Sequence, residues 1–122
     1  MKKILVIEDA KTIAKVMELM LLESGYQPIL AFDAAQAVMF AQRERPDLII
    51  LDIMLPAGGG YEVAKKLRIS TNTQFIPIIV FSAADINEVR EKIAQYDIHY
   101  FVEKPDTAKL MMQIDDILGG SE

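Results

Sequence analysis

The chain has 122 residues, of which 52% are hydrophobic and 25% charged, and its net charge is −5. This length allows one domain with its own core, and the absence of cysteine excludes a disulfide framework and a thiolate metal site. Its apolar runs are too short to cross a bilayer, and its acidic charge argues against direct binding to nucleic acid. We therefore expect a cytoplasmic chain that binds proteins or a cation.

Strand and helix signals alternate from the start of the chain. Residues 4–7 are apolar and mostly β-branched, as in a buried strand. Asp9 stands where a helix cap is expected, and Gly25 ends the helix that follows. The predicted apolar face of this helix holds Ile13, Val16, Met17, Met20 and Leu21.

The next two strand signals differ in strength. Residues 27–32 form a weaker strand, and Pro28 within it indicates the edge of a sheet. Asp33 and Gln36 then form a capping box for a helix to about residue 44. Residues 48–51 are wholly apolar, as in a strand covered on both faces, and Asp52 follows directly. Because an unpaired buried charge is costly, we expect a cationic partner for Asp52 at the end of this strand.

The second half of the chain continues the alternation. Residues 57–60 contain three glycines and predict a flexible turn. The later signals are a helix over 61–69, a strand over 78–81, a helix capped by Asp85 and Glu88 to about residue 95, a strand over 98–103, and a helix with Leu110, Ile114, Ile117 and Leu118 on one stripe. Five strands alternating with helices predict an α/β fold, a parallel sheet with helices on both faces.

Polar side chains follow four of the five predicted strands. Glu8 and Asp9 follow the first strand, Asp52 the third, Ser82 the fourth and Lys104 the fifth, so all should meet at the carboxyl edge of the sheet. Three carboxylates this close repel one another unless a cation intervenes, and oxygen ligands with incomplete protein coordination suit Mg²⁺. With a metal, a lysine and a hydroxyl beside it, a carboxylate could attack a phosphoryl group.

These residues, in this order, resemble the receiver domain of bacterial response regulators. The resemblance runs from Lys2 to about Leu118, and its motifs are Ile-Glu-Asp at 7–9, Leu-Asp-Ile-Met-Leu-Pro at 51–56, Gly60, Ser82-Ala83 and Lys104-Pro105. It implies a flavodoxin-like three-layer sandwich with five helices and strand order 2-1-3-4-5. It also implies a cis Lys104–Pro105 bond and a receiver domain over residues 1–118. The last residues, Gly-Gly-Ser-Glu at 119–122, predict a linker or tail.

The resemblance implies a role for each site residue. Asp52 would accept the phosphoryl group in a Mg²⁺-dependent reaction, Lys104 and Ser82 would hold phosphoryl oxygens, and Phe101 would swing inward when Ser82 moves. The metal ligands would be Asp9 and Asp52 directly, Glu8 through water, and Met54 through its backbone carbonyl.

The same resemblance implies a signalling switch rather than an enzyme, since the chain would catalyse only its own phosphorylation and dephosphorylation. The donor would be a sensor histidine kinase or a histidine phosphotransfer protein, and the downstream target is unknown. Two alternatives stay open, a degenerate receiver that serves only for docking and a phosphatase of the haloacid-dehalogenase type. The phosphatase needs an Asp two residues after its nucleophile, where this chain has Met54.

Overall fold

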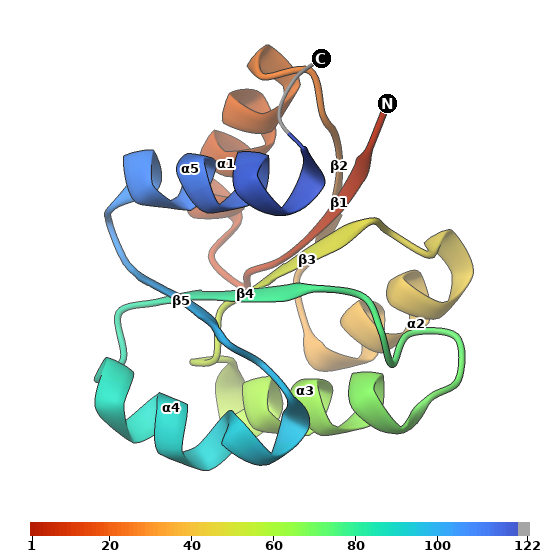
Figure 1. The fold of residues 1–122 in the computed structure, drawn as a ribbon, viewed down its shortest axis with the longest axis vertical. Coiled ribbons are helices and arrows are strands. Elements are labelled where there is room, and N and C mark those ends of the chain that lie inside the picture. The colour runs from red at the N-terminus through yellow and green to blue at the C-terminus, as the bar shows by residue number, and fades with distance from the viewer. Residues whose placement is uncertain (120–122) are drawn as a thin grey trace.

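A five-stranded parallel sheet lies between two layers of helices in the computed structural model, which describes residues 1–119 (Figure 1). The strands are β1 (Lys3–Ile7), β2 (Gln27–Ala31), β3 (Leu48–Leu51), β4 (Ile78–Ser82) and β5 (Tyr100–Glu103), in the order β2-β1-β3-β4-β5. The helices in these residues are α1 (Lys11–Glu23), α2 (Ala34–Glu44), α3 (Gly59–Ile69), α4 (Ile86–Ile93) and α5 (Thr107–Leu118). The predicted fold and strand order are confirmed.

The helices divide between the two faces of the sheet. Helices α1 and α5 cover one face, and α2, α3 and α4 cover the other (Figure 1). Because side chains alternate along a strand, β1 contributes to both resulting cores. Ile4 and Val6 pack in the cluster with α1 and α5, whereas Leu5 and Ile7 pack in the cluster on the opposite face.

The register of the strands decides which residues meet at the carboxyl edge. The Asp52 N–H donates to the Ile7 carbonyl at 3.0 Å, so Glu8 and Asp52 leave their strands side by side. At the other side of the site, the Lys104 N–H donates to the Ser82 carbonyl at 3.0 Å. The Lys104–Pro105 peptide bond is cis, as expected.

Local sequence signals explain two of the helix starts and one strand position. The Asp33 carboxylate accepts a hydrogen bond from the Gln36 N–H at 2.7 Å, and Asp85 accepts from two backbone amides at the start of α4. Pro28 lies in β2, which forms one edge of the sheet. These three predictions are confirmed.

The predicted cap of α1 is wrong. The helix begins at Lys11 with Ala10 at the N-cap position, and no side chain caps it. The Asp9 carboxylate instead groups with those of Glu8 and Asp52 at the edge of the sheet. The position of Asp9 therefore suits it to attract a cation to this edge rather than to cap α1.

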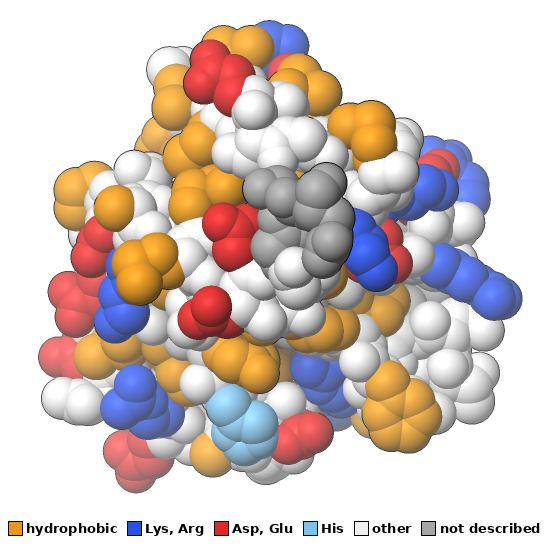
Figure 2. Space-filling view, turned by 45° about the horizontal axis from the view of Figure 1, so that its top comes forward, with side chains coloured by type: hydrophobic (Ala, Val, Ile, Leu, Met, Phe, Trp, Pro, Cys, Tyr) orange, Lys and Arg blue, Asp and Glu red, His pale blue; other side chains and the backbone are white. Residues whose placement is uncertain are grey.

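The predicted buried face of α1 is wrong in part. Met17 and Leu21 are buried together with Ala14, but Ile13 and Val16 are 41% and 58% exposed. Apolar residues lie around most of this helix, so periodicity alone does not choose one face, and the close approach to the sheet selects the side with a small alanine. Figure 2 shows apolar side chains exposed among charged ones on the face of the molecule that it displays.

The segment after Pro56 is more regular than the predicted turn. A 3₁₀ turn over Pro56–Gly58 leads directly into α3, which therefore begins at Gly59 rather than residue 61. At Gly60 an added Cβ would lie 2.2 Å from the Ile53 carbonyl oxygen, so this packing admits only glycine. Smaller differences occur in β5, which begins at Tyr100 rather than residue 98, and in α4, which ends at Ile93.

The described part of the chain holds no helix with the length and hydropathy needed to span a membrane. The predicted tail over 119–122 lies outside the described residues except for Gly119, which caps α5 with φ +81°. Glycine adopts this left-handed conformation without strain, which explains how the helix ends there.

Candidate functional site

Three carboxylates gather at the carboxyl edge of the sheet, as the sequence predicts. One oxygen from each of Glu8, Asp9 and Asp52 lies within 4.8 Å of the others. Glu8 and Asp52 are buried, at 2% and 7% exposed, while Asp9 faces solvent. A set of hard oxygen donors that is open on one side fits Mg²⁺, which keeps some of its water ligands when it binds a protein.

Lys104 is the cationic partner that the Asp52 position requires. Its Nζ donates to Asp52 Oδ2 at 2.7 Å and forms an ion pair with Glu8. Burial alone would lower the pKa of Lys104, but the hydrogen bonds to Asp52 and Glu8, together with the negative charges of these carboxylates, outweigh burial and raise it. Burial raises the pKa of Glu8, against the lowering effect of the hydrogen bond from Lys104. The lysine therefore stays charged among carboxylates that outnumber it.

The Asp52 carboxylate is held by donors on both of its oxygens. Ser82 Oγ donates to Oδ1 at 2.9 Å, and the Met54 N–H donates to the same oxygen at 3.0 Å. Lys104 Nζ donates to the other oxygen, Oδ2. These contacts fix the direction of a carboxylate that lies at the open end of its strand, so it can react without first being reoriented.

Phe101 lies behind the site, on β5. Phe101 is 8% exposed and belongs to the larger core cluster. Ser82 and Phe101 line the same small cavity between β4, β5 and α4. The Arg90 guanidinium on α4 stacks over the ring, with its carbon 4.9 Å from the ring centroid. The spacing of residues in the sequence does not predict this contact, because it joins α4 to β5 and depends on how α4 is rotated about its axis.

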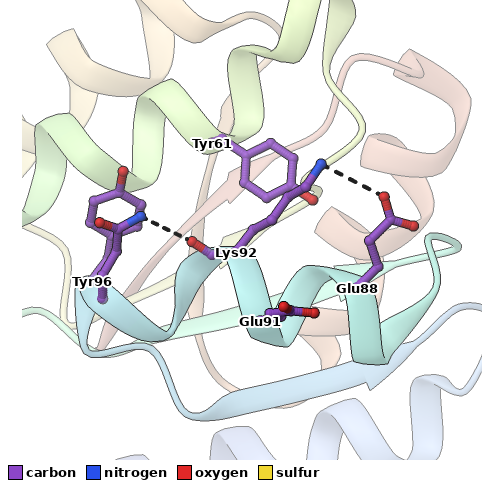
Figure 3. Close-up of a pocket in the computed structure, with 6 residues that line it drawn as sticks. Tyr61, Glu88, Glu91, Lys92 and Tyr96 are labelled. Atoms are coloured by element: carbon purple, nitrogen blue, oxygen red, sulfur yellow. Dashed lines mark hydrogen bonds and ion pairs between the residues drawn. The ribbon is translucent and has the colours of Figure 1, made fainter.

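A groove runs between α3 and α4 (Figure 3). Tyr61 and Tyr96 line it together with Glu88, Glu91 and Lys92, and it encloses about 500 Å³. The Lys92 ammonium lies 5.2 Å from the centroid of the Tyr61 ring and 3.6 Å from Glu88 Oε1. The side chains suited to phosphoryl chemistry lie at the edge of the sheet, not in this groove.

The structure thus brings together every side chain that the sequence places in the site. Asp52 contacts Ser82 and Lys104 directly, and Glu8 and Asp9 adjoin it. The direct ion pair of Glu8 with Lys104 was not among the expected contacts. Met54 contributes its N–H, and metal binding by its carbonyl stays a prediction.

Comparisons with known proteins agree with this geometry. A family model described as the response regulator receiver domain matches residues 4–115. The chain is 43% identical over 84 residues to the alkaline phosphatase synthesis transcriptional regulatory protein PhoP of Bacillus subtilis, which covers 69% of this chain and 34% of that protein. It is 33% identical over 108 residues to the phosphate regulon transcriptional regulatory protein PhoB of Escherichia coli, covering 88% and 47%. The chain therefore spans about a third to a half of the length of these curated relatives.

Solved structures with this fold match nearly the whole chain. The receiver domain of the sensor histidine kinase PA1611 from Pseudomonas aeruginosa has a TM-score of 0.86 and 32% identity over 98% of both chains. That structure holds a magnesium ion in its active site cleft. The chemotaxis protein CheY4 of Vibrio cholerae has a TM-score of 0.88 and 25% identity, covering 96% of this chain and 98% of that one.

Proposed function

The chain belongs to the response regulator receiver domain family, and we propose that it acts as a phosphorylation-dependent signalling switch. Asp52 accepts a phosphoryl group from a phosphohistidine on a sensor histidine kinase or a histidine phosphotransfer protein. The observation that carries this proposal is the position of the Asp52 carboxylate, which is bonded by Ser82 and Lys104 and adjoins two further carboxylates.

In the transfer, a carboxylate oxygen of Asp52 attacks phosphorus, the bond from phosphorus to the histidine nitrogen breaks, and an aspartyl phosphate forms. Lys104 and Ser82 already donate to Asp52, so both lie within reach of oxygens on a group attached to it. Lys104 holds one phosphoryl oxygen and Ser82 another. The prior orientation of these donors lowers the cost of stabilising the transferring group.

The carboxylates of Asp9 and Asp52 would hold Mg²⁺, with Glu8 bound through water and Met54 through its carbonyl. When bound, the ion neutralises charge on the transferring group. The excess of carboxylates over ammonium groups at this edge supports the assignment. Glu8 has a second role here, because its ion pair holds Lys104 beside Asp52.

Phosphorylation replaces the single negative charge of the Asp52 carboxylate with a phosphoryl group of roughly −2, and it places three acceptor oxygens next to Ser82 and Lys104. These donors favour the phosphorylated arrangement, and Phe101 on β5 moves with Ser82, since both line one cavity. The surface formed by α4 and β5 then changes for a downstream target. We assign the switch to residues 1–118, as one cytoplasmic domain followed by a linker or tail over 119–122. Because the chain is acidic, we expect that this domain does not itself bind nucleic acid.

Neither alternative has an observation in its favour. A receiver used only for docking need not keep the reactive groups, yet Ser82 and Lys104 both donate hydrogen bonds to Asp52. In a phosphatase of the haloacid-dehalogenase type a second Asp should stand at position 54, where the Met54 side chain is 59% exposed. Mg²⁺ binding separates the docking alternative from the switch, since docking does not require the ion.

The test is phosphorylation by acetyl phosphate with Mg²⁺, followed by intact-mass measurement. We expect the mass of one phosphoryl group to appear on the wild-type chain and to be absent from Asp52→Asn. Asp116→Asn is the matched control, because Asp116 is an exposed aspartate on α5. The proposal is wrong if the wild type gains no mass, or if Asp52→Asn gains as much as the control.

A further inference from the structure

The ring of Phe101 is held from two sides that differ in chemistry. On its inner side it packs in the larger core cluster, with Val80, Val89 and Ile98 among its members. On its outer side lies the guanidinium of Arg90, 4.9 Å from the ring centroid. Arg90 is exposed, and within residues 1–119 its side chain forms no ion pair or hydrogen bond, so this stacking is the one polar contact of the side chain there.

A shared cavity joins this stacked pair to the phosphorylation site. Ser82 donates to Asp52 at 2.9 Å, and its Oγ accepts from the Ala84 N–H at 3.3 Å. Ser82, Ala84 and Phe101 line the same cavity. The ring therefore forms one wall of the space beside the hydroxyl, and outward movement of the ring would enlarge that space.

We propose that Arg90 is a positioning residue of the switch, which holds the Phe101 ring inside the protein in the arrangement where Ser82 donates to Asp52. This inference rests on the proposed function and adds a regulator of the same site. A guanidinium is attracted to the face of an aromatic ring, and Arg90 makes that contact with the ring inside. The contact therefore stabilises the inward arrangement and should tighten the binding of a phosphoryl group that favours it.

The expected size follows from the exposure of Arg90. Cation–π contacts at exposed sites correspond to roughly a two- to fivefold shift in an equilibrium between two states. Removing the guanidinium should lower the ratio of inward to outward Phe101 by that factor. The apparent affinity for a phosphoryl analogue should fall by up to the same factor, depending on how far the inward state is populated.

The chain offers two matched controls. Lys92 lies on the same helix but stacks over Tyr61 and faces the groove between α3 and α4 (Figure 3). Arg43 stacks over Phe40 at the same 4.9 Å, on α2, away from Ser82. Lys92→Gln removes a charge from α4, and Arg43→Gln removes an arginine–phenylalanine contact elsewhere.

The experiment uses ¹⁹F NMR of the full chain labelled with 4-fluorophenylalanine, with the Phe101 signal assigned from Phe101→Leu. Without any phosphoryl analogue, we expect Arg90→Gln to shift the Phe101 signal toward the outward state by the two- to fivefold change in ratio. Arg90→Lys should return the Phe101 signal part of the way to its wild-type position, since lysine keeps the positive charge. The inference is overturned if Arg90→Gln leaves the signal in place, or if Lys92→Gln or Arg43→Gln moves it equally.

Beryllofluoride with Mg²⁺ provides the second measurement. Its affinity should fall in Arg90→Gln, and this fall should vanish when Phe101 is already leucine, because the ring that Arg90 contacts is gone. An equal fall in the Phe101→Leu background would contradict the inference. If the wild type binds no beryllofluoride, the proposed function fails, while the ¹⁹F signal still tests the contact between Arg90 and Phe101.

Discussion

Two polar clusters at opposite ends of the sheet differ in the groups that surround their charged side chains. At the carboxyl edge, the ammonium of Lys104 pairs with Glu8 and Asp52, and the Asp9 carboxylate adjoins both. At the amino ends of β4 and β5, the guanidinium of half-buried Arg68 donates to three backbone carbonyls, those of Gln74, Ile76 and Tyr96, at 3.1, 2.8 and 2.8 Å.

The difference separates a structural cluster from a functional one. The Arg68 donors meet neutral oxygens that would otherwise lack partners, so this cluster closes the loops before two strands and calls for no ligand. The carboxyl edge keeps uncompensated negative charge in a partly buried position, which is costly for folding and favourable for binding a cation. Four changes should separate the clusters further.

The largest expected effect is on chemistry. Asp52→Asn should abolish phosphorylation while changing the free energy of unfolding by less than about 1 kcal/mol, because relief of repulsion between carboxylates offsets the weakened contact with Lys104. Intact mass after acetyl phosphate treatment and urea unfolding measure the two effects. A loss of stability as large as that of an Arg68 variant would remove the distinction between the clusters.

The next effect is on stability. Arg68→Met should lower the free energy of unfolding by about 2–4 kcal/mol, because three carbonyl oxygens lose their donor. The variant protein that remains folded should still bind beryllofluoride with Mg²⁺, because Arg68 does not contact the carboxyl edge. Arg43→Met on α2 is the control for loss of an arginine, and urea unfolding that gave equal values for both would contradict the structural role of Arg68.

A third polar contact should behave as Arg68 does. The Tyr26 hydroxyl donates to Asp115 Oδ1 at 2.5 Å, and burial together with this bond raises the pKa of Tyr26 to about 12. Because the folded pKa lies above the unfolded value, the stabilisation is complete below about pH 10 and is lost as the pH rises to 12.

Tyr26→Phe should therefore cost about 1.5–3 kcal/mol at neutral pH. The difference between wild type and variant, measured by urea unfolding, should shrink between pH 10 and 12. A difference that stayed constant over this range would show that the hydroxyl is not the group that titrates.

The smallest effect is binding of the ion itself. Mg²⁺ at ten times its dissociation constant should stabilise the wild type by about 1.4 kcal/mol, by mass action. Asp9→Asn should lose most of this gain, and Arg68→Met should keep it. Thermal unfolding with and without Mg²⁺ measures the increment, and equal increments in wild type and Asp9→Asn would remove Asp9 from the ligand set.

The sequence by itself determined the order of strands and helices and the residues that gather at one edge. Asp33 and Asp85 predict helix starts because the carboxylate of a capping residue accepts hydrogen bonds from backbone amides only two or three residues away. Asp52, Ser82 and Lys104 are predictable together because the ends of parallel strands share one edge, whatever the detailed packing.

The tertiary structure decided the contacts between elements. The buried side of α1, the placement of Asp9 away from the helix cap, and the ion pair of Glu8 with Lys104 follow from how β1 and α1 meet the rest of the sheet. Arg68 and Arg90 read as ordinary helix arginines, and the rotation of α3 and α4 gives them their partners. Signals within a sequence act over a few residues, whereas these contacts join residues whose distance is set only when the elements pack.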